Sequence, residues 1–73
     1  MARARTLREW RVLRGETQKQ ASAAVGVHPV TWSEYERGKM IPSAMILQRI
    51  ARYCGCSSDD ILLLDLRKRR EPP

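Results

Sequence analysis

The chain has 73 residues, with fourteen lysine and arginine residues against eight aspartate and glutamate residues, which gives a formal net charge of +6. This length allows one domain with a thin core and little volume for a buried catalytic cleft, and no apolar run approaches the ~20 residues of a membrane span. The excess of positive charge favours a polyanionic partner, either a nucleic acid or an anionic membrane surface.

The first two expected helices share one start signal. A helix is predicted over 6–14, because Thr6 and Glu9 have the spacing of a capping box. A second helix is predicted over 18–25, where Thr17 precedes the same pattern. Both segments are followed by glycine, which is a common residue just beyond a helix end.

Two further helices are predicted from a proline and a serine. Pro29 suits the first position of a helix over 29–37, because its missing N–H would be unpaired there in any case. Ser43 can cap a helix over 44–54, whose apolar residues follow the helical period.

A fifth helix is predicted over 58–66, with Asp59 and Asp60 in its first turn, where the helix dipole favours carboxylates. The expected domain organisation is a basic N-terminal arm (1–5), one helical domain (6–66) and a basic, disordered tail (67–73).

The two cysteines, Cys54 and Cys56, are separated by one residue. Two cysteines and one histidine cannot complete a tetrahedral zinc site within one chain, and a disulfide across one intervening residue would be strained. We interpret both as free, buried thiols, and we expect neither a metal nor another cofactor.

Gly26, Val27 and His28 separate the second expected helix from the third. A short glycine-containing turn between two short helices is the helix-turn-helix connection, which lets the second helix project into a DNA groove. Many unrelated helical hairpins share this turn, so it does not establish a function by itself.

A wider pattern runs through residues 7–62 in one register. Its six anchors are Leu7-Arg8-Glu9-Trp10-Arg11, Thr17-Gln18, Gly26-Val27, Tyr35-Glu36-Arg37-Gly38-Lys39, Pro42-Ser43 and Gly55-Cys56-Ser57. The pattern resembles the phage repressor and Cro class, also called the XRE-like helix-turn-helix family. The resemblance implies an all-α, five-helix lambda-repressor-like DNA-binding domain whose third helix enters the major groove.

The resemblance also implies roles for individual residues. It pairs Arg11 with Glu36 in an ion pair. A charge beside a core face would need such a partner, because an unpaired buried charge is costly. The alternative is that both residues are surface charges. It implies phosphate contacts at the start of the second helix and after the third, with solvated surface residues as the alternative: Thr17, Gln18, Arg37 and Lys39. The base-reading positions fall on His28, Pro29, Val30, Thr31 and Glu34.

The chemistry of the base-reading positions predicts a modest direct readout. Pro29 and Val30 could contact a thymine methyl group, Glu34 could accept from cytosine N4, and Thr31 could do either. His28 could instead cap the third helix, and Pro29 could serve only as the start of that helix. Backbone contacts and DNA shape would then supplement the specificity.

Two positions depart from the family pattern. Glu16 stands where an apolar residue is usual, and Ala21 where leucine is usual. We expect a slightly loose core between the first two helices, with Val12 or Leu13 filling the gap. The aromatic residues at helical spacing are expected in the core rather than stacked on single-stranded bases: Trp10, Trp32 and Tyr35.

The fifth expected helix carries more apolar residues than one face can bury. Leu63 and Leu66 are therefore candidate dimer contacts, although these residues could wrap onto their own core instead. Because family members use half-sites about one helical turn apart, we expect a homodimer on a palindromic operator.

The predicted function is a sequence-specific, double-stranded-DNA-binding transcription regulator of repressor type, cytoplasmic and nucleoid-associated, with neither a membrane nor a small-molecule partner. An enzyme is disfavoured, because the chain has one histidine, no carboxylate dyad in register and no phosphate loop. The main alternative is an antitoxin or adaptor that captures a protein through the fifth helix and the tail. An RNA-binding protein is disfavoured by the lack of a strand-borne aromatic motif or a GxxG loop.

Overall fold

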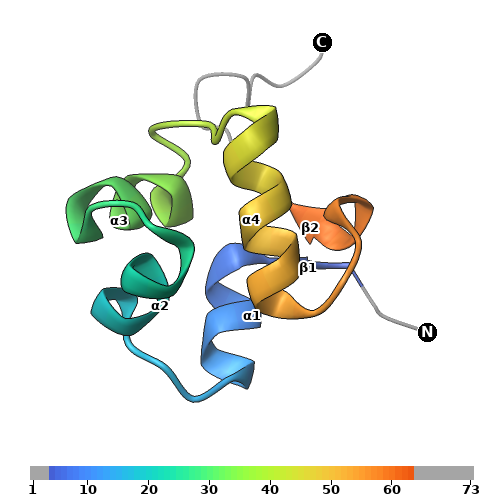
Figure 1. Cartoon of the computed structure of the whole chain (residues 1–73), viewed down its shortest axis with the longest axis horizontal. Helices are drawn as coiled ribbons and strands as arrows, with labels where there is room; N and C mark the ends of the chain where they lie inside the picture. The colour runs from blue at the N-terminus through green and yellow to red at the C-terminus, as the bar shows by residue number, and fades with distance from the viewer. Residues whose placement is uncertain (1–3, 64–73) are drawn as a thin grey trace, which may run out of the picture.

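The computed structural model describes residues 4–63; Arg3, Leu66 and the expected tail 67–73 lie outside them. Within this range there are four α-helices and a two-stranded sheet (Figure 1). The first strand precedes the helices, and a short 3-10 turn leads from the last helix to the second strand. The elements are β1 (Arg5–Thr6), α1 (Leu7–Leu13), α2 (Gln18–Val25), α3 (Pro29–Arg37), α4 (Ala44–Cys54), η1 (Ser58–Asp60) and β2 (Ile61–Leu62). None of the described helices is long and apolar enough to cross a membrane.

The first four predicted helices are confirmed, and their caps explain their boundaries. The hydroxyls of Thr6, Thr17 and Ser43 accept the backbone N–H three residues on, at 3.2, 3.1 and 3.2 Å. Glu9 and Gln20 reach back to the cap N–H groups and complete two capping boxes. Each cap satisfies N–H groups that the helix itself leaves unpaired, so these short side-chain patterns set where the helices begin.

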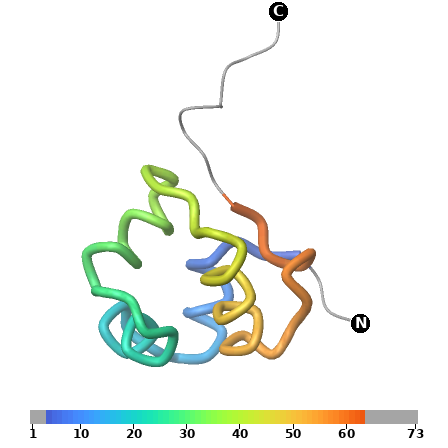
Figure 2. The backbone as a smooth tube through the Cα atoms, turned by 45° about the horizontal axis from the view of Figure 1, so that its top comes forward, coloured from blue at the N-terminus to red at the C-terminus, as the bar shows by residue number. Residues whose placement is uncertain are grey.

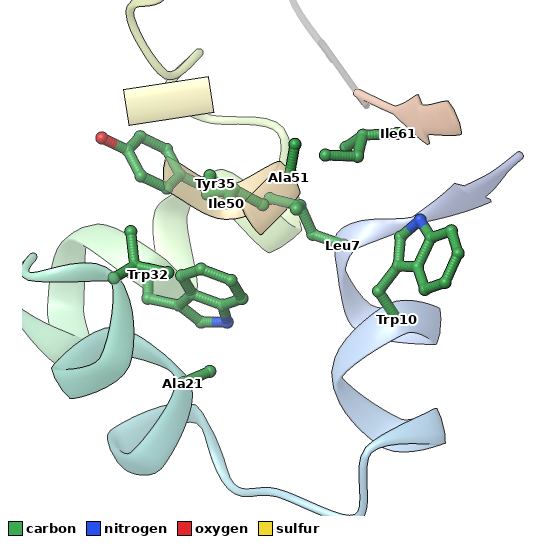
Figure 3. Packing of buried hydrophobic residues seen from close by; sticks show 9 residues of the cluster. Leu7, Trp10, Ala21, Trp32, Tyr35, Ile50, Ala51 and Ile61 are labelled. Carbon is green, nitrogen blue, oxygen red and sulfur yellow. The ribbon is translucent and has the colours of Figure 1, made fainter. Parts of the chain in front are cut away.

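The helices enclose one small core, whose side chains Figure 3 shows at close range. The prediction that the aromatic residues are buried is confirmed: Trp10 is 7% exposed, Trp32 0% and Tyr35 7%. Trp32 and Ile50 are the largest fully buried apolar side chains. The aromatic rings are therefore unavailable for stacking on bases.

Ala21 lies in the core, at the place where the sequence suggested loose packing. Ala21 and Trp32 are both fully buried, and Figure 3 shows the Ala21 methyl group close to the Trp32 indole. Val12 and Leu13 remain 56% and 60% exposed, so the expectation that one of them fills the gap was wrong. We interpret the Trp32 indole as filling space that a leucine at position 21 would take.

Glu16, the other departure from the family pattern, belongs to a polar cluster. The Tyr53 hydroxyl donates to Glu16 Oε1 at 2.5 Å, and the Arg14 guanidinium lies 4.4 Å from the centre of the Tyr53 ring. Burial, together with the hydrogen bond to Glu16, raises the pKa of Tyr53 to about 12. A charged residue is tolerated here because its partner comes from α4.

The segment after α4 does not form the fifth helix expected over 58–66. Its described part forms η1 and β2, and β2 pairs in parallel with β1, as the neighbouring blue and orange segments of Figure 2 show. Arg5, placed by the sequence in a basic arm, lies opposite Ile61, and Thr6 lies opposite Leu62. The expected all-α, five-helix fold is thus corrected to four α-helices and a minimal sheet over residues 4–63.

Tertiary contacts explain this difference. A local helix start does form at the predicted place, because Ser57 and Asp60 make a capping box around η1. However, the Asp60 carbonyl accepts the indole N–H of Trp10 at 3.1 Å, across a sequence separation of 50 residues. Ile61 is buried to 7% exposure, and its strand pairs with β1. These contacts hold the segment extended where local propensity favours a helix.

Candidate nucleic-acid interface

Helices α2 and α3 are joined by a tight turn, and they lie on the side of the molecule away from the sheet (Figures 1 and 2). Gly26 ends α2 with φ +90°, a left-handed conformation that glycine adopts without steric cost. His28 caps α3, because its Nδ1 accepts the N–H of Val30 at 3.0 Å. The turn is therefore specified at both ends, which fixes where α3 begins.

Helix α3 has one buried and one outward face. Trp32 and Tyr35 anchor the inner face in the core. The base-reading candidates of the sequence lie elsewhere: Val30 is 57% exposed, His28 and Pro29 are exposed, and Thr31 and Glu34 are half-buried. The structure thus leaves three of these five residues exposed at the start of α3 and the other two partly accessible along it.

Glu36, near the end of α3, is the centre of a buried polar cluster. Arg11 Nε donates to Glu36 Oε2 at 2.7 Å, and Arg11 Nη2 donates to Oε1 at 3.3 Å. Gln18 Nε2 donates to Oε1 at 2.9 Å, and Trp32 Nε1 donates to Oε2 at 2.6 Å. The side chains of Arg11 and Glu36 are 14% and 4% exposed. One carboxylate therefore ties together α1, α2 and α3.

The charged state of Glu36 is maintained by its donors. Burial alone would raise the pKa of this carboxyl group, since the interior disfavours the anion. The hydrogen bonds from Arg11, Gln18 and Trp32 and the charge of Arg11 outweigh burial, and the pKa lies below its ordinary value of 4.5. The cluster therefore stabilises the fold more strongly when Glu36 is ionised than when it is protonated.

Comparisons with known proteins agree with this architecture. Residues 3–64 match a family model described as a helix-turn-helix domain. A curated relative, the uncharacterized HTH-type transcriptional regulator YazB of Bacillus subtilis (strain 168), is 37% identical over 57 residues, which are 78% of this chain and 83% of the relative. The chain belongs to the XRE-like helix-turn-helix family. No solved structure matches it significantly.

Membership in the XRE-like family confirms the resemblance drawn from the six sequence anchors. The family is DNA-binding and non-enzymatic, so the expectation that the chain is not an enzyme is also confirmed. Within the family pattern, the structure brings Arg11 and Glu36 into contact and adds Trp32 as a donor. The sequence assigned Trp32 to the core alone, because nothing local shows where an indole N–H will point.

Two of the four residues for which the XRE-like family implies phosphate contacts share one groove. Gln18 and Arg37 line one shallow groove between α1, the start of α2 and α3. Arg8 and Ser33 line the same groove, and sequence reasoning missed both. Arg8 stands three residues before Arg11, so helical periodicity could have placed it on this side. Lys39 is exposed beyond the end of α3.

Two of these family positions are already engaged within the protein. The amide of Gln18 donates one hydrogen to Glu36, which leaves its other amide hydrogen for a ligand. The Thr17 hydroxyl accepts the N–H of Gln20, and its own hydrogen is not needed for that cap. Both side chains are therefore held in fixed orientations at the start of α2.

Cys54 and Cys56 are free thiols, and both are half-buried rather than fully enclosed. Burial raises the pKa of Cys54 to about 12 and also raises the pKa of Cys56, so both are thiols rather than thiolates at neutral pH. Among the described residues, no group of three or more histidine, cysteine or acidic side chains could hold a metal ion.

The domain is expected to lose stability in acid through Glu36. The pKa of this residue in the folded state lies below its unfolded value, so the stabilisation is complete above the unfolded value. It is lost as the pH falls through the folded pKa, where protonation removes the negative charge that strengthens the hydrogen bonds from Arg11, Gln18 and Trp32.

Thermal melts at a series of pH values check this expectation. The melting temperature should hold near neutral pH and fall once the pH is below the ordinary carboxyl value of 4.5. Glu34→Gln is the matched control, because Glu34 lies on the same helix and is half-buried outside the cluster. The control should show the same acid loss. A melting temperature that stays constant well below 4.5 would contradict the role of Glu36.

Proposed function

We propose that the chain is a sequence-specific transcription regulator that binds double-stranded DNA with α3 in the major groove. The observation that carries the proposal is the outward face of α3, which is accessible on a helix whose other face is locked into the core and into the Glu36 cluster. Preorganised elements position contacts better than mobile ones, because little ordering remains to be done on binding. The name of the YazB relative, an HTH-type transcriptional regulator, supports the same function.

The base-contacting set in this proposal is His28, Pro29, Val30, Thr31 and Glu34. The exposed Val30 side chain suits contact with a thymine methyl group, and Glu34 suits an amino group such as cytosine N4. Glu34 also repels nearby phosphates, so its contribution is to discriminate among sequences rather than to add affinity. Pro29 starts the helix and adds apolar surface.

The phosphate-contacting set is Thr17, Gln18, Arg37 and Lys39. Support comes from the shared groove of Gln18 and Arg37, and from the exposure of Arg37 and Lys39. Phosphate contacts orient the protein on the duplex and make its affinity depend on salt, because binding releases condensed counterions.

The proposed assembly is a homodimer on a palindromic operator, acting as a repressor at the nucleoid in the cytoplasm, without a small-molecule ligand. The resemblance to phage repressors supports the repressor type.

Leu63 packs against the core and is half-buried, whereas its neighbour Leu62 is 49% exposed. Leu62, which the sequence did not single out, is therefore a better-supported dimer contact than Leu63. Sedimentation of the free chain and of its complex with operator-length DNA tests the dimer, and a single protomer in both would refute it.

Selection of the full chain against a random-sequence duplex library tests the proposed function. The expected result is an enriched inverted repeat that the protein shifts in a gel in the presence of excess competitor DNA. Val30→Glu should abolish this preference and leave the melting temperature nearly unchanged, since Val30 is 57% exposed. If no duplex is preferred over competitor, the proposed function is wrong, and a protein-binding antitoxin or adaptor role becomes the better explanation.

A salt titration separates the phosphate contacts from surface charges. Replacing Arg37 or Lys39 by glutamine should weaken binding similarly on all sequences, and each replacement should reduce the slope of log affinity against log salt by about 1, because one phosphate is no longer neutralised. Arg52→Gln is the matched control, because Arg52 is an exposed arginine on α4, outside the Gln18–Arg37 groove. Equal slopes for the control and the two test variants would refute these contacts.

A further inference from the structure

The cap of α3 determines which hydrogen-bonding group His28 offers to a ligand. Nδ1 of His28 accepts the N–H of Val30 at 3.0 Å. A ring nitrogen that accepts a hydrogen bond carries no proton, so the proton of the neutral imidazole must be on Nε2. An imidazolium would point a second N–H at the Val30 donor and could not form this cap. The folded helix start thus selects one tautomer.

The outer edge of His28 therefore presents one donor and no acceptor. His28 is exposed at the very beginning of α3. Pro29 and Val30, the next two residues, have no polar side-chain atoms, so apart from the capping Nδ1 the Nε2–H is the only polar side-chain group among these three residues. Glu34, farther along the same helix, offers only acceptors when ionised. The two ends of the recognition face thus have opposite hydrogen-bonding character.

We propose that His28 donates from Nε2 to an acceptor atom of the bound duplex and thereby disfavours sequences that place an amino group at that point. This inference rests on the proposed function. Purine N7, guanine O6 and thymine O4 are acceptors in the major groove, whereas the amino groups of adenine and cytosine are donors. Opposite one of these amino groups, the Nε2–H would be left unpaired in a desolvated interface, which costs affinity. A phosphate oxygen offers the same acceptor chemistry as a base edge.

The first step is tested on the free protein, without DNA. Two-bond proton–nitrogen correlation spectra of the imidazole report which ring nitrogen carries the proton. For the neutral imidazole we expect a protonated Nε2 and an unprotonated Nδ1. A ring protonated on Nδ1 would overturn the inference, whatever the chain does with DNA.

Three substitutions separate capping from donation. His28→Asn keeps the cap through its side-chain oxygen, but its amide group lies where the ring Cδ2 was and does not reach the place of Nε2. His28→Ser keeps the cap but is too short to reach the duplex. His28→Ala loses both. We expect the serine and asparagine variants to melt close to the wild type, and the alanine variant to melt several degrees lower.

Binding of the same variants to the selected duplex supplies the functional readout. His28→Ser and His28→Asn should each bind about tenfold more weakly than the wild type, because both keep the cap and neither places a donor at Nε2. Duplexes that lack one acceptor atom locate the contact: 7-deazaguanine removes a base N7, and a methylphosphonate removes a charged phosphate oxygen. The 7-deazaguanine duplex should weaken the wild type but not His28→Ser. If only the methylphosphonate does so, the acceptor is a phosphate oxygen, and the inferred discrimination between base edges is wrong.

The outcomes distinguish this inference from the proposed function. If the wild type binds its selected duplex and His28→Ser binds it with equal affinity and specificity, His28 is a helix cap alone and the inference is wrong. If no acceptor-deleted duplex weakens the wild type more than it weakens His28→Ser, the contact does not depend on a donated hydrogen bond, and the inference is also wrong. If the wild type prefers no duplex, the proposed function fails together with it.

Discussion

Glu36→Ala is expected to destabilise the domain by about 3–5 kcal/mol, because it leaves the guanidinium of Arg11 without its carboxylate in a largely buried site. The same change removes the acceptor of the Gln18 amide and of the Trp32 indole N–H. Since a domain of this size has a net stability of only a few kcal/mol, most molecules of the variant should be unfolded at room temperature. Chemical denaturation followed by circular dichroism measures the loss.

A double-mutant cycle shows whether this loss comes from the pair. Arg11→Met alone should also destabilise strongly, since it leaves a buried carboxylate with fewer donors. Combined with Glu36→Leu it should cost much less than the sum of the two single changes, because apolar residues can replace a buried ion pair. Glu34→Ala, on the same helix, is the control and should change the stability by no more than about 0.5 kcal/mol. Additive effects of the two changes would contradict a coupled pair.

Ala21 and Trp32 are expected to behave as a size-matched pair. Trp32→Leu alone should cost about 3 kcal/mol, because it removes a fully buried ring and one donor to Glu36. Ala21→Leu alone should cost about 1–3 kcal/mol, since the added atoms meet the indole in a filled core. The double variant should be more stable than the sum predicts, because the leucine at position 21 refills part of the volume that the ring vacates.

Denaturation midpoints of the two single variants and the double variant check this expectation. Ala24→Leu is the matched control, because Ala24 lies on α2 but is exposed, and leucine there should be nearly neutral. A stabilising effect of Ala21→Leu by itself would show that the core beside Ala21 is loose after all. Absence of coupling in the double variant would show that the two side chains do not share a volume.

The candidate site illustrates how far a local pattern reaches. The exposed positions of α3 follow directly from its sequence, because Trp32 and Tyr35 set the buried face and helical periodicity places the others. The contact between Arg11 and Glu36 joins residues 25 positions apart, so no local pattern specifies it and the family resemblance had to imply it. Neither source suggested that Trp32 donates to the same carboxylate, because that depends on the rotamer that the packed core allows.

By itself, the sequence determined the four α-helices, their boundaries and the turn between α2 and α3, because caps and glycine stops act over three or four residues. The tertiary structure decided the pairing of β2 with β1, the burial of Ala21 and Trp32 in one core, and the convergence of donors on Glu36. Each of these depends on groups that are distant in the chain, and their free energy of interaction exists only once the helices have packed. Where such contacts compete with a local signal, as at the capping box of Ser57, burial and backbone pairing outweigh the local preference.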